Sequence, residues 1–165
     1  MPLKFQTATA ADVPGLVALR NAVSQYLASQ SGGVLRAAVV TERGVWFAMS
    51  RAHVLIARYR GKPIATLALS TRKPWAIDAS YFSPTAAPVY LTDMAVHPRH
   101  QRKGIGAECM KQAVEHARNW PATAVRLDAY DAAYGAGDFY RKCGFREVGR
   151  ATYRSAPLIY FELIL

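Results

Sequence analysis

Three observations in the sequence predict an α+β fold with a single mixed, mostly antiparallel sheet flanked by helices. The chain of 165 residues is 52% apolar and 19% charged, which is ordinary for a globular protein and sufficient for one full core. Its strand-like and helix-like segments follow the order β-α-α-β-β-β-α-β-α-β-β. The strand–helix–strand run over 89–130 requires a parallel pair with a right-handed crossover, whereas the rest implies antiparallel neighbours. We therefore expect one domain over residues 1–165.

The first half of the chain is expected to form a strand, two helices and a hairpin. Thr9 followed by Asp12 fits a capping box, and the apolar residues that follow recur at helical spacing. The Val, Ile, Thr and Leu content of the hairpin suits a sheet, with a turn at Gly61-Lys62. The expected bounds are a strand at 3–8, a helix from 13 to a break at 29–33, a helix within 34–50, and two strands within 53–70.

Residues 72–88 are expected to form a long loop, because they hold three prolines and show no helical period. Loops of this length are often functional. The aromatic residues Trp75, Tyr81 and Phe82 would then either contact a substrate or anchor the loop to the core. The sequence leaves both alternatives open.

The second half is expected to add four strands and two helices. Apolar residues from Ile105 to Ala117 lie on one helix face, and Pro121 follows that helix. Gly144 is expected to end the second, shorter helix. The expected bounds are strands at 89–96, 124–130, 145–154 and 158–165, and helices at 104–120 and near 135–143.

Charge and cysteine usage restrict the functional classes. The net charge is +10, from 21 Lys and Arg against 11 Asp and Glu, which favours anionic partners. Cys109 and Cys143 form no Cys-x-x-Cys pair, and His97 and His100 have no nearby third ligand, so we expect no metal site. No apolar run approaches the roughly 18 residues of a membrane span, and the N-terminal residues lack signal-peptide features. We expect a cytoplasmic protein with no membrane association.

The stretch "HPRHQRKGIGAE", His97–Glu108, places cationic side chains directly before a helix start. Gly104 and Gly106 allow the backbone to approach a ligand closely. The first N–H groups of a helix lack intrahelical partners and carry partial positive charge, which suits a phosphate. A dinucleotide fingerprint is excluded because Cys109 occupies its third glycine position, and no P-loop pattern exists.

The residues on both sides of this stretch resemble the GCN5-related N-acetyltransferase (GNAT) superfamily. "LTDMAVHPRHQRKGIGAE" is similar to the family signature, in which a strand ends in an apolar residue and is followed by Pro and by Gln/Arg-x-x-Gly-x-Gly/Ala. "GDFYRKCGFREVG" (137–149) resembles the later family element with Tyr on a short helix followed by Gly-Phe. "PLIYFELIL" resembles the closing strand. The resemblance implies an acyl-CoA N-acyltransferase fold with acetyl-CoA as co-substrate.

The resemblance also assigns residues to the cofactor and the chemistry. The pyrophosphate would lie on backbone amides of the loop, and the strand before it would bond the pantetheine and the acetyl carbonyl. Tyr140 would face the thioester sulfur as a catalytic hydrogen-bond donor. The family often has Asn seven residues before this Tyr, where this chain has Ala133, so that contact is lost or supplied by another group such as Asp131. The implied cofactor-binding residues are Met94, Ala95, Val96, Gln101, Arg102, Lys103, Gly104, Ile105, Gly106, Ala107 and Tyr140.

The general base is the least specified part of the candidate site. The positions expected to face the acceptor are Tyr90 and Thr92, and neither is a ready base. Asp93 is the only carboxylate on the strand; strict alternation would point it to the other face, although a bulge near Met94 could re-aim it. We treat Asp93 as the candidate catalytic base, with ordered water as the alternative.

Three functions therefore remain, and the resemblance favours the first. It implies acetyl transfer to a primary amine of a small molecule or a protein by direct attack on the thioester. The second is a non-catalytic acyl-CoA-binding sensor or structural module of the same fold. The third is nucleic-acid binding, which we regard as unlikely because no reader motif is present and the densest basic cluster is assigned to cofactor phosphates. The sequence identifies neither the acceptor nor the oligomeric state, and a homodimer is compatible with it.

Overall fold

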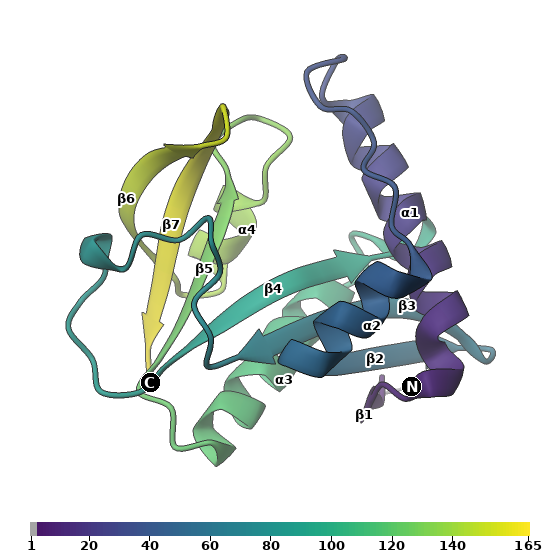
Figure 1. The fold of residues 1–165 in the computed structure, drawn as a ribbon, viewed down its shortest axis with the longest axis horizontal. Coiled ribbons are helices and arrows are strands. Elements are labelled where there is room, and N and C mark those ends of the chain that lie inside the picture. Colours follow the sequence, from purple (N-terminus) through teal and green to yellow (C-terminus); the bar gives the residue numbers. More distant parts are fainter. Residues whose placement is uncertain (1–2) are drawn as a thin grey trace. The chain divides into compact units, whose positions relative to one another are not determined.

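The computed structural model describes residues 3–165, and these residues follow the expected order of strands and helices (Figure 1). One mixed sheet has the strand order β1-β2-β3-β4-β5-β7-β6. β4 and β5 are parallel, whereas the β1–β2, β2–β3, β5–β7 and β6–β7 pairs are antiparallel. The predicted fold class is therefore confirmed.

The strands are β1 Phe5–Thr7, β2 His53–Tyr59, β3 Lys62–Ser70, β4 Pro88–Val96, β5 Ala124–Tyr130, β6 Arg146–Tyr153 and β7 Ala156–Ile164. The helices are α1 Val13–Gln30, α2 Glu42–Arg51, α3 Ile105–Asn119 and α4 Gly137–Lys142, with 3-10 turns η1 Ala10–Asp12, η2 Ala79–Tyr81 and η3 Pro98–His100.

The described residues divide into two compact units. Unit 1 contains residues 3–69 and Thr92–Ala113, and unit 2 contains Ser70–Leu91 and Val114–Leu165. The expectation of one domain over 1–165 stays a prediction, and Met1 and Pro2 lie outside the described residues.

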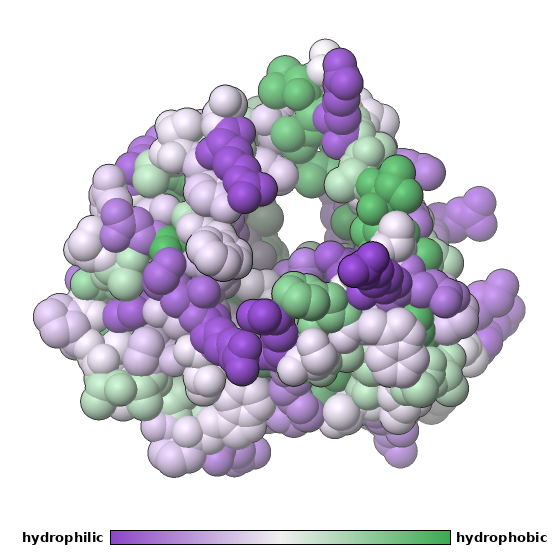
Figure 2. Space-filling model, in the orientation of Figure 1, coloured by the Kyte–Doolittle hydropathy of each residue, from purple (hydrophilic) through white to green (hydrophobic). Residues whose placement is uncertain are grey.

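In unit 1, α1 and α2 cover one face of β2 and β3 (Figure 1). The capping interaction at the start of α1 is present, since the Asp12 carboxylate accepts a 2.8 Å hydrogen bond from the Thr9 N–H. The connection from α1 to α2 exposes apolar side chains, and Figure 2 shows an apolar surface at this end of α1. Val34 and Val39 there are 71% and 83% exposed. The core of this face consists of Ala8, Val13, Leu16, Val45, Val54, Ile56 and Ala68.

In unit 2, the segment before β4 packs on one face of β5 and β7. Phe82 and Ile77 are buried with Leu158 and Tyr160 of β7. The Tyr160 hydroxyl donates to the Ala76 carbonyl at 2.6 Å and accepts from the Asp78 N–H at 3.2 Å. Residues 72–88 are thus fastened to the sheet, which confirms the anchoring alternative for Phe82. Trp75, in contrast, is 89% exposed.

A buried ion pair ties the same segment to β5 and β7. Arg126 Nε donates to Glu162 Oε2 at 3.1 Å, and the two side chains are only 6% and 0% exposed. Arg126 also donates to the Tyr90 hydroxyl at 3.2 Å and to the Ser83 carbonyl at 2.7 Å. The second Glu162 oxygen accepts from the Ser83 N–H at 3.3 Å. The Arg126 guanidinium lies 4.8 Å from the centre of the Phe82 ring. These contacts offset the free-energy cost of burying the two charges.

Gly149 in β6 allows this segment to approach the sheet closely. β6 has an irregular register between Glu147 and Gly149 opposite β7. A Cβ atom at position 149 would lie 2.2 Å from Cδ1 of Tyr81. The Tyr81 ring in turn packs edge-on against Tyr160 with 5.4 Å between ring centres. A glycine is therefore required here because any side chain would clash with the Tyr81 ring, and not because of its backbone angle.

Candidate functional site

The loop before α3 has a backbone that few side chains would adopt. Arg102 has φ +59° and Gly104 has φ +82°, both in the left-handed region. A Cβ on Gly104 would meet nothing within 4 Å, so a side chain would not clash here. The glycine is required because it adopts this backbone angle without strain. Successive backbone N–H groups in a turn that includes left-handed residues can point toward a common centre, which forms a concavity suited to an anion.

The start of α3 supplies the donors of this surface. The Glu108 N–H makes the first helical bond, to the Gly104 carbonyl at 3.1 Å. Within residues 3–165, the N–H groups of Ile105, Gly106 and Ala107 have no hydrogen-bond acceptor. Unpaired N–H groups and the helix dipole both favour a negative charge here. The predicted CoA loop over 102–107 therefore has the donor set that a pyrophosphate requires.

Side chains at the start of the loop hold it in shape. Gln101 Nε2 donates to the Val96 carbonyl at 3.0 Å, and Lys103 Nζ donates to the Arg99 carbonyl at 3.0 Å. The His97 imidazole Nδ1 accepts from the Arg99 N–H at 3.2 Å. Gln101 and the Val96 carbonyl, both predicted to contact the cofactor, are thus engaged within the protein. Both groups therefore fix the loop, and their contact with a cofactor stays a prediction.

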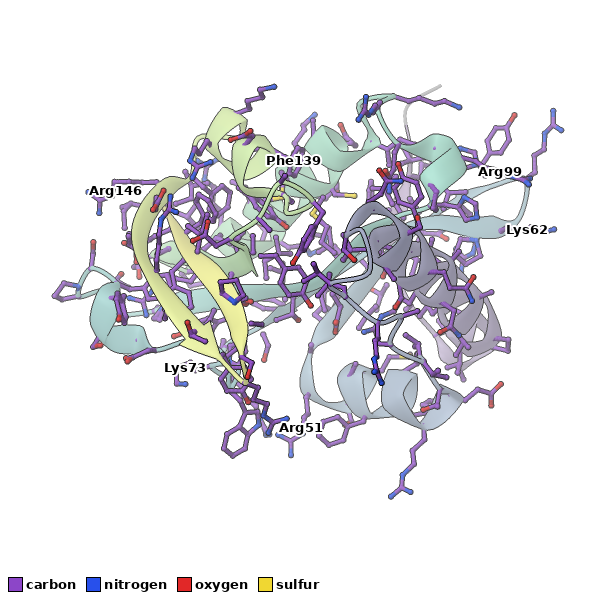
Figure 3. The ribbon with its side chains drawn as sticks, turned by 90° about the horizontal axis from the view of Figure 1, so that it is seen from above. Arg51, Lys62, Lys73, Arg99, Phe139 and Arg146 are labelled. Carbon is purple, nitrogen blue, oxygen red and sulfur yellow. The ribbon has the colours of Figure 1, made fainter. Side chains whose placement is uncertain are left out.

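Positive charge surrounds this loop within unit 1. Arg99 and Lys62 project from neighbouring segments at the same end (Figure 3), and the rings of Tyr59 and His100 join these segments with 5.6 Å between their centres. Burial lowers the pKa of His97, and the nearby charges of His100 and Arg99 lower it further. Because a lowered pKa favours neutral imidazole, Nδ1 can keep accepting the Arg99 N–H at neutral pH.

Asp93 lies in β4 with a backbone that interrupts the strand. Its φ is +51°, so strict alternation does not hold at this residue, as the bulge alternative anticipates. Its Oδ1 accepts from Nη2 of Arg20, on α1, at 2.8 Å. The Arg20 and Asp93 side chains are 24% and 38% exposed. Asp93 is therefore turned toward α1 and solvent, and its charge is already paired.

Tyr140 lies in unit 2 and is buried in an aromatic cluster. Its ring centre is 5.2 Å from Phe139, 5.9 Å from Phe145 and 5.8 Å from Phe161. Its carbonyl accepts from the Phe145 N–H at 3.1 Å, which fixes the turn after α4. The packing role of Tyr140 is thus present, and its role at the thioester stays a prediction.

Side-chain contacts bear on two further expectations. Tyr90, which the sequence places at an acceptor-facing position, is buried and accepts a hydrogen bond from Arg126, and its place at the acceptor stays a prediction. Asp131, considered as a substitute for the Asn missing at position 133, is held by Arg150 Nη1 through both carboxylate oxygens at 3.0 Å. Asp131 therefore has a structural partner on β6.

Sequence reasoning missed Arg20, because an arginine on a surface helix resembles any solvated side chain. Its specific partner, Asp93, lies 73 residues away in the sequence and is brought to it by the fold.

Across residues 3–165, no cluster of three or more His, Cys, Asp or Glu side chains could hold a metal ion. In the same range no helix combines the length and apolar character needed to cross a membrane.

Comparison with known proteins gives a consistent result. The model of the family described as "Acetyltransferase (GNAT) family" matches residues 21–145. No curated protein sequence matches the chain.

Three solved structures illustrate the likeness of the fold. The ribosomal-protein-S18-alanine N-acetyltransferase from Escherichia coli is 14% identical with a TM-score of 0.73, covering 99% of this chain and 94% of its own. The yncA structure from Salmonella typhimurium with its cofactor acetyl-CoA is 18% identical with a TM-score of 0.70 and the same coverages. The PaiA N-acetyltransferase from Thermoplasma acidophilum in complex with coenzyme A is 14% identical with a TM-score of 0.73, covering 97% and 98%.

Proposed function

Because the chain belongs to the acetyltransferase (GNAT) family, we propose that it transfers the acetyl group of acetyl-CoA to a primary amine. The observation that carries this proposal is the loop before α3, with left-handed backbone at Arg102 and Gly104 and open N–H groups from Ile105 to Ala107. Similar folds that hold acetyl-CoA or coenzyme A support the choice of donor. The loop would hold the pyrophosphate, and Met94–Val96 of β4 would align the acyl end.

The reaction demands a neutral amine. An alkyl amine with a pKa of about 10.4 is neutral in only about 1 molecule in 2,500 at pH 7, which adds about 4–5 kcal/mol to the barrier. When bound, acetyl-CoA supplies a thioester whose carbonyl carbon bonds to the amine nitrogen, and the carbon–sulfur bond then breaks to release the thiolate. The acceptor ammonium loses two protons overall, one before the attack and one after it, while the thiolate gains one and the other passes to solvent. The protein must therefore provide a route for each proton.

Two residues would provide these routes. Asp93 can receive the incoming ammonium group at its carboxylate and pass the released proton to solvent, which its exposure permits. Tyr140 would donate a hydrogen bond to the leaving thiolate. A backbone N–H near Ala95 would stabilise the oxyanion that develops on the carbonyl. With Arg20 beside it, Asp93 serves better as an ammonium-binding charge than as a strong base, and water completes proton removal.

The loop assignment can be tested by calorimetry with acetyl-CoA. Gly104→Val forces a β-branched residue into the left-handed region and should weaken binding at least about tenfold. Gly106→Val should also abolish binding, because its side chain would cover the open N–H groups at the start of α3. The matched control is Gly33→Val, since Gly33 has φ +90° and no atom near its Cβ position but lies in the α1–α2 connection. Normal affinity in both loop variants would refute the phosphate-binding assignment.

A non-catalytic acyl-CoA-binding module is the second candidate, favoured by the pairing of Asp93 with Arg20. The two functions separate in one assay, which follows CoA thiol release from acetyl-CoA with a panel of primary amines. An enzyme should release CoA only when an amine is present, and Tyr140→Phe should lower turnover while nearly preserving acetyl-CoA affinity. Binding of acetyl-CoA without release for any amine would support the non-catalytic module.

A further inference from the structure

The Arg20–Asp93 pair is not explained by stability. Both side chains reach solvent, and exposed ion pairs contribute little to folding. Asp93 also holds a left-handed backbone inside a strand, which is unfavourable for a residue with a side chain. Within residues 3–165, the Asp93 side chain has no hydrogen-bond partner other than the half-buried Arg20 guanidinium. A strained residue with so little structural engagement indicates a role in binding.

The pair keeps unused hydrogen-bonding capacity. Within residues 3–165, Arg20 donates only through Nη2, and Asp93 accepts only through Oδ1. A guanidinium has five N–H donors, and a carboxylate has two oxygens with two lone pairs each. The pair therefore offers open donors and an open acceptor side by side, with positive and negative charge 2.8 Å apart.

The space beneath the pair is too small for a ligand. The cavity there measures about 10 Å³, which is room for one water molecule. The Thr66 hydroxyl in its wall is already bonded to the Leu55 carbonyl. A ligand on the pair must therefore extend outward, and only its charged end would contact the protein here. The cavity walls are Leu16, Val45, Ala48, Met49, Val54, Thr66 and Ala68.

We propose that Arg20 and Asp93 select acceptor amines that carry a carboxylate on the carbon bearing the amino group, as free amino acids do. The carboxylate of the acceptor accepts from the open N–H groups of Arg20, while its ammonium group donates to the open oxygen of Asp93. Opposite charges then alternate around the contact. A polyamine would instead bring a second positive charge toward Arg20, in a protein that already carries +10.

This selection rests on the proposed function, because it places the acceptor nitrogen at Asp93. The next residues of β4, Met94–Val96, are those predicted to align the acetyl group. The side chain of the acceptor would point to solvent, so the pair discriminates by the charged end and tolerates different side chains.

Matched acceptors test the selection directly. CoA release would be compared for L-leucine, L-leucinamide and 3-methylbutylamine, which share one side chain and differ in the carboxylate. Each rate would be divided by the fraction of neutral amine, because the carboxylate also changes the pKa of the amino group. A second set would contain L-phenylalanine, its amide and phenethylamine. One charge-assisted hydrogen bond corresponds to about 10- to 100-fold in kcat/KM. We expect each free amino acid to exceed its amide and its decarboxylated amine by that factor.

Variants of Arg20 identify the source of the preference. Arg20→Gln should bring the ratio of amino acid to amide close to one, mainly through a higher KM for the amino acid, and Arg20→Lys should restore part of it. Arg118→Gln, on an exposed part of α3, is the control and should keep the full ratio. Thermal unfolding of all variants checks that they are folded.

The outcomes separate the two proposals. Equal rates for all three members of each set would overturn the selection but leave amine acetylation standing. A preference that persists in Arg20→Gln would also overturn it, because another group would then recognise the carboxylate. The absence of CoA release with every amine would overturn the proposed function and the selection with it.

Discussion

Two arginine–carboxylate pairs in this protein have the same chemistry and opposite surroundings. Arg126 and Glu162 are buried, and their polar atoms are shared with Ser83 and Tyr90. Arg20 and Asp93 reach solvent and make one hydrogen bond between them. All three guanidinium nitrogens of Arg126 and both carboxylate oxygens of Glu162 have partners within the protein, whereas Arg20 and Asp93 each use one atom. Burial and the number of internal partners distinguish a charge that holds the fold from one that is available for binding.

The largest effect is expected at the buried pair. Glu162→Leu leaves the Arg126 guanidinium in a site from which water is excluded, without its counter-charge. We expect this change to lower the free energy of unfolding by about 3–5 kcal/mol, measured by urea denaturation with an unchanged slope. A loss below about 1 kcal/mol would show that water reaches Arg126 and would remove the contrast between the two pairs.

A smaller effect is expected at the exposed pair. Arg20→Gln should change the free energy of unfolding by no more than about 1 kcal/mol, because water solvates both partners once they separate. The same urea experiment measures it, and added salt should reduce the difference from the unmodified protein further. A loss as large as that of Glu162→Leu would mean that Arg20 holds α1 in place, contrary to the binding role argued for it.

The smallest effect is expected at a third cluster, in which Glu147 accepts from Arg150 at 2.7 Å and from Arg141 at 2.9 Å. Hydrogen bonds from Arg150 and then Arg141 lower the pKa of Glu147 below its ordinary value of 4.5. The stability that the carboxylate contributes is therefore complete above pH 4.5 and is lost as the pH falls through the lowered value. Glu147→Gln should be slightly less stable than the unmodified protein at pH 7. Thermal unfolding from pH 7 to pH 3 should show this difference disappearing, and a difference independent of pH would exclude the charge as its cause.

The fold was predictable because its determinants are local. The spacing of apolar residues predicts each helix from a few neighbouring positions, and Pro121 and Gly144 predict where the helices end. In the structure α3 ends at Asn119 and α4 at Lys142, as these residues require. The turn before α3 was predictable for the same reason, since its glycines and basic residues are contiguous and Gly104 has the left-handed backbone that a glycine allows. Its binding of CoA stays a prediction.

The partners of the charged residues were not predictable, because folding brings them together from distant positions. Arg20 is 73 residues from Asp93, and Arg126 is 36 residues from Glu162. Strict alternation of side chains along β4 also did not predict the direction of Asp93, because no neighbouring residue indicates its left-handed backbone. Tyr90 was assigned to the acceptor from its position on the strand, and that position could not reveal that its hydroxyl accepts from Arg126, 36 residues later.

The close approach of Tyr81 to Gly149 has a consequence for how such a chain can diversify. The course of the segment before β4 depends on a missing side chain in β6, more than 60 residues later. A single added methyl group at position 149 would displace the Tyr81 ring, and with it the contact to Tyr160. Exchanging the segment over 70–87 between related chains should therefore succeed only if position 149 is exchanged with it.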